Sequence, residues 1–373
     1  MLRRYQVALE LQPILGKRSG IGNYTYELAK RLSDDEDLQF GGNLFNFRGR
    51  AARPELAMPV RECKGLAYGA YRRLWHWLPV NYVSLFPWAD LSIFFNYIVP
   101  PRISGKVMTT IHDLTWLRYP ETMDKKNLRR IAGDIDYSLE RADRIVTVSE
   151  FSKKELSELL DIPAAKIVVV PCAGGDMPES GDFAEITKKY GLDEPYLLYV
   201  GNIEPRKNLP RLLQAFDLLK REQGIAHKLV IAGGSGWGNG EFQQALQKMK
   251  CAGDVVQVGY VEPGEKRALY ENAGAFVFSS LYEGFGIPPL EAMSCGCPVV
   301  CANAASLPEV VGEAAEMVEP MSVTSIAEGI WRVISDESRA ADLVSKGYEQ
   351  VKKFSWEQSA AKLKAVCREV LGV

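Results

Sequence analysis

The chain has 373 residues, with 45 basic and 47 acidic side chains and a formal net charge of −2. This balance gives no reason to expect a general nucleic-acid-binding protein, because such proteins carry an excess of basic residues. The length is sufficient for two domains with full hydrophobic cores.

The start of the chain predicts neither a signal peptide nor a membrane span. Residues 1–4 lead directly into an apolar strand pattern, and the longest uncharged stretch, 74–89, contains two prolines and is shorter than the roughly 18 apolar residues of a span. The seven cysteines show no secreted-type framework, so we expect reduced thiols and a cytoplasmic protein. Cys295, Cys297 and Cys301 are expected to be buried rather than zinc-binding, because zinc requires four ligands and the histidines are distant in sequence.

Apolar strands alternate with amphipathic helices along the whole chain, which predicts an α/β fold with parallel sheets. In the first half we expect strands at 5–11, 40–47, 91–95, 106–111, 144–148 and 167–170, and helices near 22–33, 124–142 and 150–160. A polar, glycine-bearing stretch separates this half from the next strand. The predicted division is a first domain at 1–175, a linker at 176–194, a second domain at 195–354 and a final helix at 355–373.

Residues 68–88 interleave basic and aromatic side chains, among them Trp88. Such mixtures favour a membrane interface, where aromatic rings lie at headgroup depth and cations meet anionic lipid. Packing within the domain is an equally weighted alternative, because the stretch has no clean helical moment. The residues expected to contact acceptor or membrane are Arg72, Arg73, Trp75 and Trp77.

Two strand–loop–helix units open the second half. The strand at 196–200 is followed by a loop that ends in Arg206 and Lys207 at a helix start, where fixed charge and the helix dipole both favour a diphosphate. The strand at 228–232 leads into a glycine turn that begins at Gly233. This turn does not complete the dinucleotide fingerprint, because Asn239 stands where its last glycine should be.

The most informative run places two carboxylates, Glu283 and Glu291, eight residues apart. A buried strand at 275–279 precedes them, and two adjacent prolines suit the first turn of a helix, so Glu283 should lie in a loop and Glu291 just inside the helix. Taken alone, such a pair more often consists of solvated glutamates. Three residues between them can turn backbone N–H groups toward a ligand: Phe285, Gly286 and Ile287.

These loops and residues 306–312 closely resemble the C-terminal half of family 4 glycosyltransferases. The segments 20–25, 110–114 and 146–152 are similar to motifs of the N-terminal half, and the resemblance is weakest over 40–90. It implies the GT-B fold, in which two Rossmann-like domains face each other across a cleft. The first domain would bind the acceptor and the second the nucleotide sugar, and the last helix would return to the first domain.

The resemblance also implies the roles of individual residues. Arg206 and Lys207 would bind the donor diphosphate and stabilise the charge that grows on it. Glu283 would hold the transferred sugar, His112 would contact it by a hydrogen bond, and Glu291 would accept hydrogen bonds from the ribose. The expected catalytic residues are therefore His112, Arg206, Lys207 and Glu283. The expected donor-binding residues are Gly20, Gly22, Gly201, Gly233, Gly259, Tyr260, Val261, Phe285, Gly286, Ile287 and Glu291. His76 and His227 are expected to be structural.

Family members retain the anomeric configuration, and no carboxylate here is an evident nucleophile. We therefore expect the front-face route, in which the leaving phosphate helps to deprotonate the acceptor. No metal or other cofactor is expected, because the D-x-D triplet at 134–136 falls in a helical pattern where residues two apart do not share a face.

The segments 20–25, 110–114 and 201–209 resemble bacterial mannosyltransferases of polysaccharide assembly. We therefore expect mannose transfer from GDP-mannose to a saccharide or lipid-linked acceptor in cell-surface polysaccharide (O-antigen) synthesis, with the protein cytoplasmic or peripheral to the cytoplasmic membrane. A transferase that uses UDP-linked glucose or N-acetylglucosamine is the main alternative. A sugar-nucleotide epimerase, a non-catalytic sugar-nucleotide-binding subunit and an NAD-linked oxidoreductase are weaker alternatives.

Overall fold

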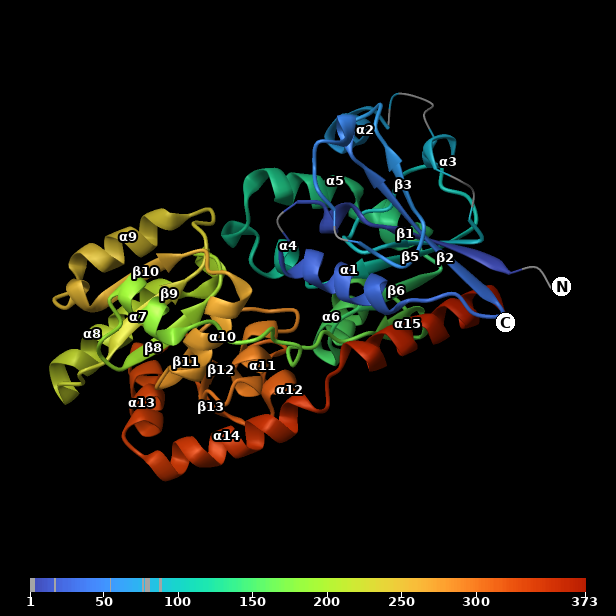
Figure 1. The fold of residues 1–373 in the computed structure, drawn as a ribbon. Helices are drawn as coiled ribbons and strands as arrows, with labels where there is room; N and C mark the ends of the chain where they lie inside the picture. The colour runs from blue at the N-terminus through green and yellow to red at the C-terminus, as the bar shows by residue number, and fades with distance from the viewer. Residues whose placement is uncertain (1–3, 17, 54, 76, 78–80, 87–88) are drawn as a thin grey trace. The chain divides into compact units, whose positions relative to one another are not determined.

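The computed structural model describes residues 4–373 except 17, 54, 76, 78–80 and 87–88 (Figure 1). His76 and Trp88 therefore lie outside the described residues. Contacts divide the chain into two compact units. The first comprises the residues up to Leu114, Lys125–Cys172 and Trp356–Val373, and the second comprises Thr115–Asp124 and Ala173–Ser355.

The first unit is built on a parallel seven-stranded sheet with the strand order β3-β2-β1-β4-β5-β6-β7. Its strands are β1 (Tyr5–Glu10), β2 (Leu38–Phe45), β3 (Val60–Cys63), β4 (Leu91–Phe94), β5 (Lys106–Ile111), β6 (Arg144–Thr147) and β7 (Ile167–Val169). Its helices are α1 (Gly20–Arg31), α2 (Tyr68–Leu74), α3 (Tyr82–Leu85), α5 (Lys125–Arg141), α6 (Glu150–Leu160) and α15 (Trp356–Leu371). Strand β3 and helices α2 and α3 fall in the stretch where the sequence predicted no element.

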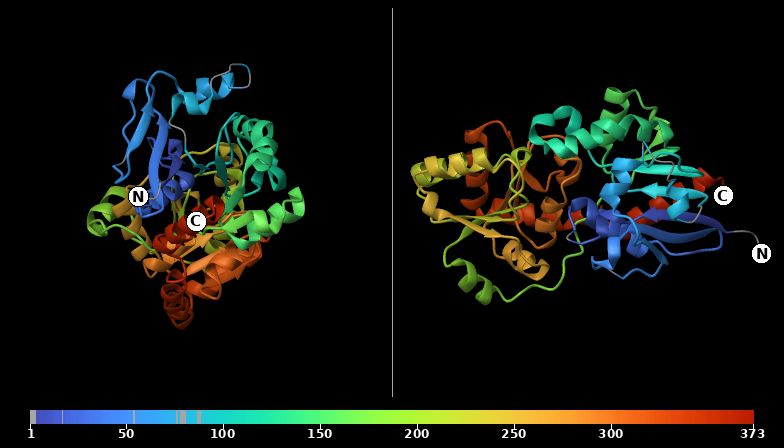
Figure 2. Two further views of the ribbon diagram at one scale, coloured as in Figure 1. Left: turned by 90° about the vertical axis from the view of Figure 1, so that its right-hand side faces the viewer. Right: turned by 90° about the horizontal axis from the view of Figure 1, so that it is seen from above.

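The C-terminal helix α15, red in Figures 1 and 2, belongs to the first unit and lies against α1. Tyr24 of α1 packs edge-on against Trp356 of α15, with ring centroids 6.0 Å apart, and its hydroxyl donates to the carbonyl of Val170 at 3.0 Å. Arg31 of α1 also forms an ion pair with Glu357 at 2.6 Å. Aromatic packing and charge thus hold this helix on the N-terminal part of the chain.

The second unit is a parallel six-stranded sheet with the order β10-β9-β8-β11-β12-β13. Its strands are β8 (Tyr196–Val200), β9 (Lys228–Ala232), β10 (Val255–Gly259), β11 (Ala275–Phe278), β12 (Val299–Ala302) and β13 (Ala315–Val318). Its helices are α4 (Thr115–Arg118), α7 (Phe183–Tyr190), α8 (Leu209–Gln223), α9 (Asn239–Lys248), α10 (Pro263–Glu271), α11 (Ile287–Ser294), α12 (Leu307–Val311), α13 (Val323–Ile334) and α14 (Glu337–Val351). Both sheets show the order of a doubly wound fold, as the alternating pattern predicted.

The expected linker at 176–194 is not a plain connection, because it contains α7. Asp182 caps this helix by accepting the backbone N–H groups of Ala184 and Glu185, and Gly191 ends it in the left-handed conformation. The helix belongs to the second unit. Its polar composition, which suggested a linker, is that of a surface helix with Ile186 as its buried residue.

The short segment Thr115–Asp124 belongs to the second unit although the chain on both sides of it belongs to the first. Tyr119 packs against the ring of Tyr282, with centroids 5.6 Å apart. The indole N–H of Trp237 donates to the carbonyl of Thr122 at 2.7 Å. Both contacts lie beside loops that follow strands of the second sheet.

Candidate functional site

The second sheet brings Arg206, Lys207 and Glu283 together at its topological switch point. The strand order reverses between β8 and β11, so the loops that follow these two strands meet at the carboxyl edge, where open α/β sheets bind ligands. Arg206 and Lys207 come from the first loop and Glu283 from the second. A guanidinium nitrogen of Arg206 and the ammonium of Lys207 each lie 2.6 Å from a different carboxylate oxygen of Glu283.

These three charges are largely removed from water and held in place by further contacts. Their side chains are 15%, 14% and 10% exposed, in the order Arg206, Lys207, Glu283. Arg206 also donates to the carbonyl of Tyr282, and the ammonium of Lys207 lies 5.3 Å from the ring centroid of Phe278. Burial alone would raise the pKa of Glu283, but the two cations outweigh it and lower the pKa to about 2. Two cations share one carboxylate, so the cluster carries a net positive charge.

Glu291 lies in α11, inside the helix as predicted, and is held by two partners from α10. Lys266 donates to one carboxylate oxygen at 2.6 Å, and the Tyr270 hydroxyl donates to the other at 3.1 Å. The residue is 8% exposed. Gly286 precedes the helix with φ 108°, a conformation that suits glycine, and a Cβ there would meet a methyl of Leu307 at 2.6 Å.

Three glycines of the predicted donor-binding set end neighbouring strands and touch one another through their backbones. The N–H of Gly233 donates to the carbonyl of Gly259 at 2.7 Å, and the N–H of Gly201 donates to that of Ala232 at 2.9 Å. The next two residues after Gly259 differ in exposure, with Tyr260 63% exposed and Val261 8% exposed. At these three glycines the edge of the sheet presents mainly backbone peptide groups, which a ligand can approach closely.

Gly233→Ala is expected to destabilise the second unit by on the order of 3 kcal/mol, because the residue has φ 152° and a Cβ would lie 2.0 Å from the carbonyl oxygen of Gly201. Thermal unfolding would measure the loss. The matched control is Gly240→Ala, where the added Cβ meets nothing within 4 Å at the start of α9. An alanine at Gly233 that is tolerated as well as the control would contradict the prediction.

The segment 306–312 supports the loop that carries Glu283. The Ser306 hydroxyl lies 2.8 Å from the carbonyl oxygen of Glu283 and 3.0 Å from that of Phe285, and it shares one proton between them. At the other end of this segment, the Gln350 side chain of α14 donates to the carbonyl of Val310 at 2.8 Å. The segment thus joins the Glu283 loop to α14.

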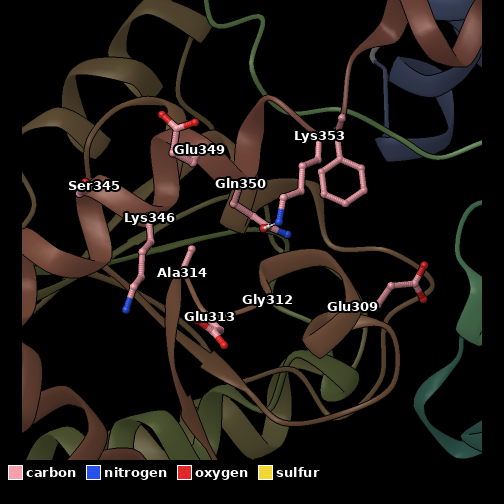
Figure 3. Close-up of a pocket in the computed structure, with 10 residues that line it drawn as sticks. Glu309, Gly312, Glu313, Ala314, Ser345, Lys346, Glu349, Gln350 and Lys353 are labelled. Atoms are coloured by element: carbon pink, nitrogen blue, oxygen red, sulfur yellow. Dashed lines mark hydrogen bonds between the residues drawn. The ribbon is translucent and has the colours of Figure 1, made fainter.

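A surface pocket of about 560 Å³ lies beside this segment (Figure 3). It is lined by Glu309, Gly312, Glu313, Ala314, Ser345, Lys346, Glu349, Gln350, Lys353 and Phe354. Figure 3 shows Lys353 reaching toward Gln350, to which its ammonium donates at 2.7 Å. Phe354 also packs edge-on against Phe285, with centroids 5.4 Å apart. Two polar side chains of this pocket, Gln350 and Lys353, are therefore already hydrogen-bonded within the protein.

His112 follows β5 in the first unit and is 8% exposed. Its Nε2 lies 2.7 Å from the carbonyl oxygen of Phe95. A carbonyl can only accept, so Nε2 carries the proton and Nδ1 is left as an acceptor. Burial lowers the pKa of His112 below 6.5, against the opposing effects of the Phe95 carbonyl and Asp113. The ring is therefore neutral at pH 7, and the rings of Tyr24 and Tyr97 pack edge-on against it.

His112→Ala tests the hydrogen bond to the reacting sugar that the family resemblance implies. Its loss is expected to lower kcat by about tenfold or more, because such a bond is worth on the order of 1.5 kcal/mol. Steady-state kinetics with a saturating donor would measure the loss. His227→Ala is the control, since His227 is also partly buried and burial also lowers its pKa. Normal turnover of the His112 variant would remove this residue from the reaction.

Gly20 and Gly22 lie in the first turn of α1, which begins two residues before the predicted helix at 22–33. Ser19 caps this helix, and its hydroxyl accepts the N–H of Gly22 at 3.3 Å. A Cβ on Gly22 would lie 2.6 Å from the carbonyl oxygen of Pro13, whereas one on Gly20 would meet nothing within 4 Å. The need for glycine at 22 is thus explained by packing against the turn that follows β1.

The four residues of the predicted acceptor or membrane region lie in different environments. Trp75 is 2% exposed and packs edge-on against Tyr71, with centroids 5.5 Å apart. Trp77 is 84% exposed, and Arg73 is also exposed. Arg72 is mostly buried and forms an ion pair with Asp134 at 2.9 Å. Trp75 is therefore a core residue, as the alternative interpretation had it, while Trp77 and Arg73 face solvent.

Four polar residues of the site region had no role assigned from the sequence: Asn208, Lys266, Tyr270 and Ser306. The Asn208 side chain donates to the carbonyls of Ser279 and Pro320, at 3.0 and 2.7 Å, and so connects the loop after β8 to the loops after β11 and β13. Asn208 and Ser306 fall inside segments that the sequence singled out, which could have drawn attention to them. Lys266 and Tyr270 lie in α10, where nothing in the pattern marks them.

The structure also places the three cysteines of the predicted cluster. Cys295, Cys297 and Cys301 are buried, and Cys301 lies in β12. Burial raises the pKa of all three thiols.

In the parts of the chain that the structure describes, no group of three or more histidine, cysteine or acidic side chains has a metal-binding arrangement. No helix in these same parts is both long enough and apolar enough to cross a membrane.

Known proteins match this chain over both halves. The family model "Glycosyltransferase Family 4" matches residues 18–173, and the model "Glycosyl transferases group 1" matches residues 182–350. The chain is 34% identical to O-antigen chain mannosyltransferase B of Escherichia coli over 371 residues, which cover 94% of this chain and 96% of the relative. It is 31% identical over 269 residues to the serotype-specific mannosyltransferase WbdA of Escherichia coli, of which it covers 33%.

Solved structures share the fold of both units. Sucrose-phosphate synthase from Thermosynechococcus elongatus aligns with a TM-score of 0.77 at 19% identity, over 99% of this chain and 100% of that one. HepE of Anabaena in complex with UDP and glucose aligns with a TM-score of 0.75 at 16% identity, over 98% of this chain and 100% of that one. The predicted fold is confirmed: two parallel-sheet α/β domains of the GT-B type. With the family models and a relative that spans nearly the whole chain, the protein is a glycosyltransferase and belongs to glycosyltransferase family 4.

Proposed function

We propose that this glycosyltransferase moves mannose from GDP-mannose to a saccharide or lipid-linked saccharide in the synthesis of a cell-surface polysaccharide such as O-antigen. The observation that carries the donor site is the cluster of Arg206, Lys207 and Glu283 at the switch point, where two cations share one carboxylate. The excess positive charge suits a diphosphate. Mannose is supported by the two mannosyltransferases that the chain resembles.

The residues of the second unit suggest how the donor would be held. Arg206 and Lys207 would donate to the diphosphate and stabilise the charge that develops as the sugar leaves, an effect that preorganised cations provide without reorganisation. Glu283 would accept hydrogen bonds from the sugar hydroxyls. Glu291 would accept from the ribose, and Lys266 and Tyr270 fix its carboxylate for this.

The reaction is proposed to retain the anomeric configuration by the front-face route. The leaving phosphate would take the proton of the acceptor hydroxyl as the new bond forms on the same face of the sugar. His112 would accept a hydrogen bond from the reacting sugar through Nδ1. NMR of the product tests this proposal, and an inverted anomeric centre would exclude it.

We propose that no divalent metal is needed. The D-x-D triplet at 134–136 lies within α5, and Asp134 forms an ion pair with Arg72. A second triplet, 35–37, precedes β2, and both of its aspartates form ion pairs with Arg368 of α15. The carboxylates of Asp134, Asp35 and Asp37 are therefore already paired with cations of the protein. Activity that persists in EDTA is the expected result. Activity that EDTA abolishes and magnesium or manganese restores would overturn the proposal.

A peripheral contact with the membrane is proposed for the exposed residues around the end of α2. Trp77 is 84% exposed and Leu74 42% exposed, and Arg73 supplies a cation for anionic lipid. This would place the protein at the cytoplasmic face, next to a lipid-linked acceptor. Liposome flotation tests it, and protein that stays wholly at the bottom of the gradient would count against it.

The donor is tested first by thermal shift with GDP, UDP, ADP and NAD in EDTA, because a ligand that binds the folded state stabilises it by mass action. Stabilisation by GDP is expected, followed by mannose transfer or slow hydrolysis of GDP-mannose. A response to UDP alone would favour the UDP-glucose or N-acetylglucosamine alternative. Binding without transfer or hydrolysis would favour a non-catalytic subunit.

A further inference from the structure

The first unit has a second cluster of charged and polar side chains at its own switch point. The order of its sheet reverses between β1 and β4, which end at Glu10 and Phe94. These two residues are neighbours in register, so the crevice where a ligand would bind begins beside Glu10. Glu10 is 6% exposed, and its carboxyl accepts the backbone N–H of Gln12 at 3.1 Å.

Two arginines from different helices lie close to Glu10. They are Arg72 of α2 and Arg130 of α5. Burial raises the pKa of Glu10 to about 8, while Arg72 and Arg130 act in the opposite direction. Burial also lowers the pKa of Arg130, and the charge of Arg72 lowers it further. Burial thus makes the Glu10 carboxyl hold its proton more readily than an ordinary glutamate, so it is a weak counter-ion for the two guanidinium groups.

The two arginines differ in their partners within the protein. Arg72 has the carboxylate of Asp134, with side chains 12% and 13% exposed, but its Nε is buried without a hydrogen bond. Arg130 has no ion pair or hydrogen bond among the described residues, and its Nε is also buried. Arg130 itself is half-buried, and the carboxylate of Asp134, four residues along α5, acts on it electrostatically. A buried donor without a hydrogen bond is costly, and a native protein that keeps one usually has a reason for it.

Helix α2 turns one face toward this cluster. Tyr68, Tyr71 and Arg72 are spaced three and four residues apart and so share that face. The hydroxyl of Tyr71 is buried without a hydrogen-bond partner, and Tyr68 lies within electrostatic range of Glu10 and both arginines. The Nε atoms of Arg72 and Arg130, from two different helices, and the hydroxyl of Tyr71 are therefore buried around this crevice without hydrogen-bond partners.

We propose that this crevice binds a phosphate group carried by the acceptor, through Arg130 and Arg72 with the Tyr71 hydroxyl as a further donor. This inference rests on the proposed transferase function. Two guanidinium groups offer paired N–H donors that match phosphate oxygens, and a phosphate would give Arg130 the direct hydrogen-bonded anion that it does not have among the described residues. The site lies in the first unit and uses none of the donor-binding residues of the second.

The test is calorimetric titration of the whole protein with inorganic pyrophosphate. It uses the Lys207→Ala background, in which the donor loops lose their excess charge. Arg130→Gln is expected to weaken pyrophosphate binding at least tenfold, because it removes one of the two guanidinium groups. Arg129→Gln, an exposed neighbour on α5, should leave the affinity unchanged. The melting temperatures of the unliganded variants check that both fold. Unchanged affinity in a folded Arg130 variant would overturn the proposal.

Vesicles distinguish the source of the phosphate. Soluble pyrophosphate should bind, and flotation with vesicles that contain phosphatidylglycerol should be equal for the parent protein and Arg130→Gln. Loss of flotation in that variant without any binding of pyrophosphate would instead assign the crevice to a lipid headgroup. The donor function is tested separately, because the nucleotide thermal shift should be the same with and without Arg130.

Discussion

Lys207→Ala is expected to lower kcat by about 100- to 1000-fold, with a much smaller change in the KM for the donor. In the native cluster two cations face one carboxylate, which leaves an excess positive charge. We propose that this charge acts on the departing diphosphate. Removal of Lys207 leaves Arg206 and Glu283 as a neutral pair. The excess charge that would stabilise the transition state is then gone, and loss of one such preorganised group costs about 3–4 kcal/mol. Steady-state kinetics with the donor that the nucleotide screen identifies would measure it.

Lys248→Ala is the control for this variant, because Lys248 is an exposed lysine at the end of α9. It should leave kcat and KM unchanged. A Lys207 variant that keeps near-normal turnover would show that the cation does not act on the leaving group. A variant that raises KM alone would place Lys207 in donor binding but not in the chemical step.

Glu283→Gln is expected to destabilise the second unit by about 3–5 kcal/mol in the absence of nucleotide. The amide fits the same space but leaves Arg206 and Lys207 buried, adjacent and without a carboxylate. For a unit of this size the loss corresponds to a melting temperature lower by roughly 6 to 20 °C. A nucleoside diphosphate should stabilise this variant more than the parent, since its phosphates would supply the missing negative charge.

The matched control is Glu316→Gln. Glu316 also accepts from two arginines, Arg332 at 2.7 Å and Arg339 at 2.9 Å, but these arginines are 48% and 36% exposed. Water can solvate them when the carboxylate is lost, so the control should lose far less stability. Equal losses in the two variants would contradict the argument from burial.

The pH dependence of unfolding offers a further check on Glu283. The two cations lower the pKa of Glu283 from 4.5 to about 2, so the folded state binds its proton less readily than the unfolded state. The stability that this carboxylate contributes is therefore fully present above pH 4.5 and is lost as the pH falls toward 2. Glu283→Gln should flatten that part of the profile.

Much of the donor site could be predicted from the sequence because it depends on strand order and local turns. An apolar strand followed by a loop and a helix puts the loop at the carboxyl edge of a parallel sheet, so Arg206, Lys207 and Glu283 were expected at one edge. Glu291 was expected inside a helix for the same kind of reason, since adjacent prolines mark a helix start.

The partners of these residues could not be predicted, because they come from elements whose sequences have no motif. Lys266 and Tyr270 reach Glu291 from a neighbouring helix, and the spacing within α10 gives no sign of it. Helix α7 had a signal that was overlooked, since Asp182 and Gly191 are typical of a helix start and end. In the first unit, β3 is only four residues long and has two adjacent charged residues, Arg61 and Glu62, at its centre, so no strand pattern stands out.

The assignment of Thr115–Asp124 to the second unit has a consequence for dividing the protein into fragments. The polypeptide passes from one unit to the other four times, after Leu114, Asp124, Cys172 and Ser355. A fragment that begins at Ala173 and ends at Ser355 would therefore lack ten residues of its own unit. The ring of Tyr282 and the indole of Trp237 would lose partners beside the very loops that a nucleotide-binding fragment needs. A single protease cut or a simple truncation cannot yield an intact half of this enzyme.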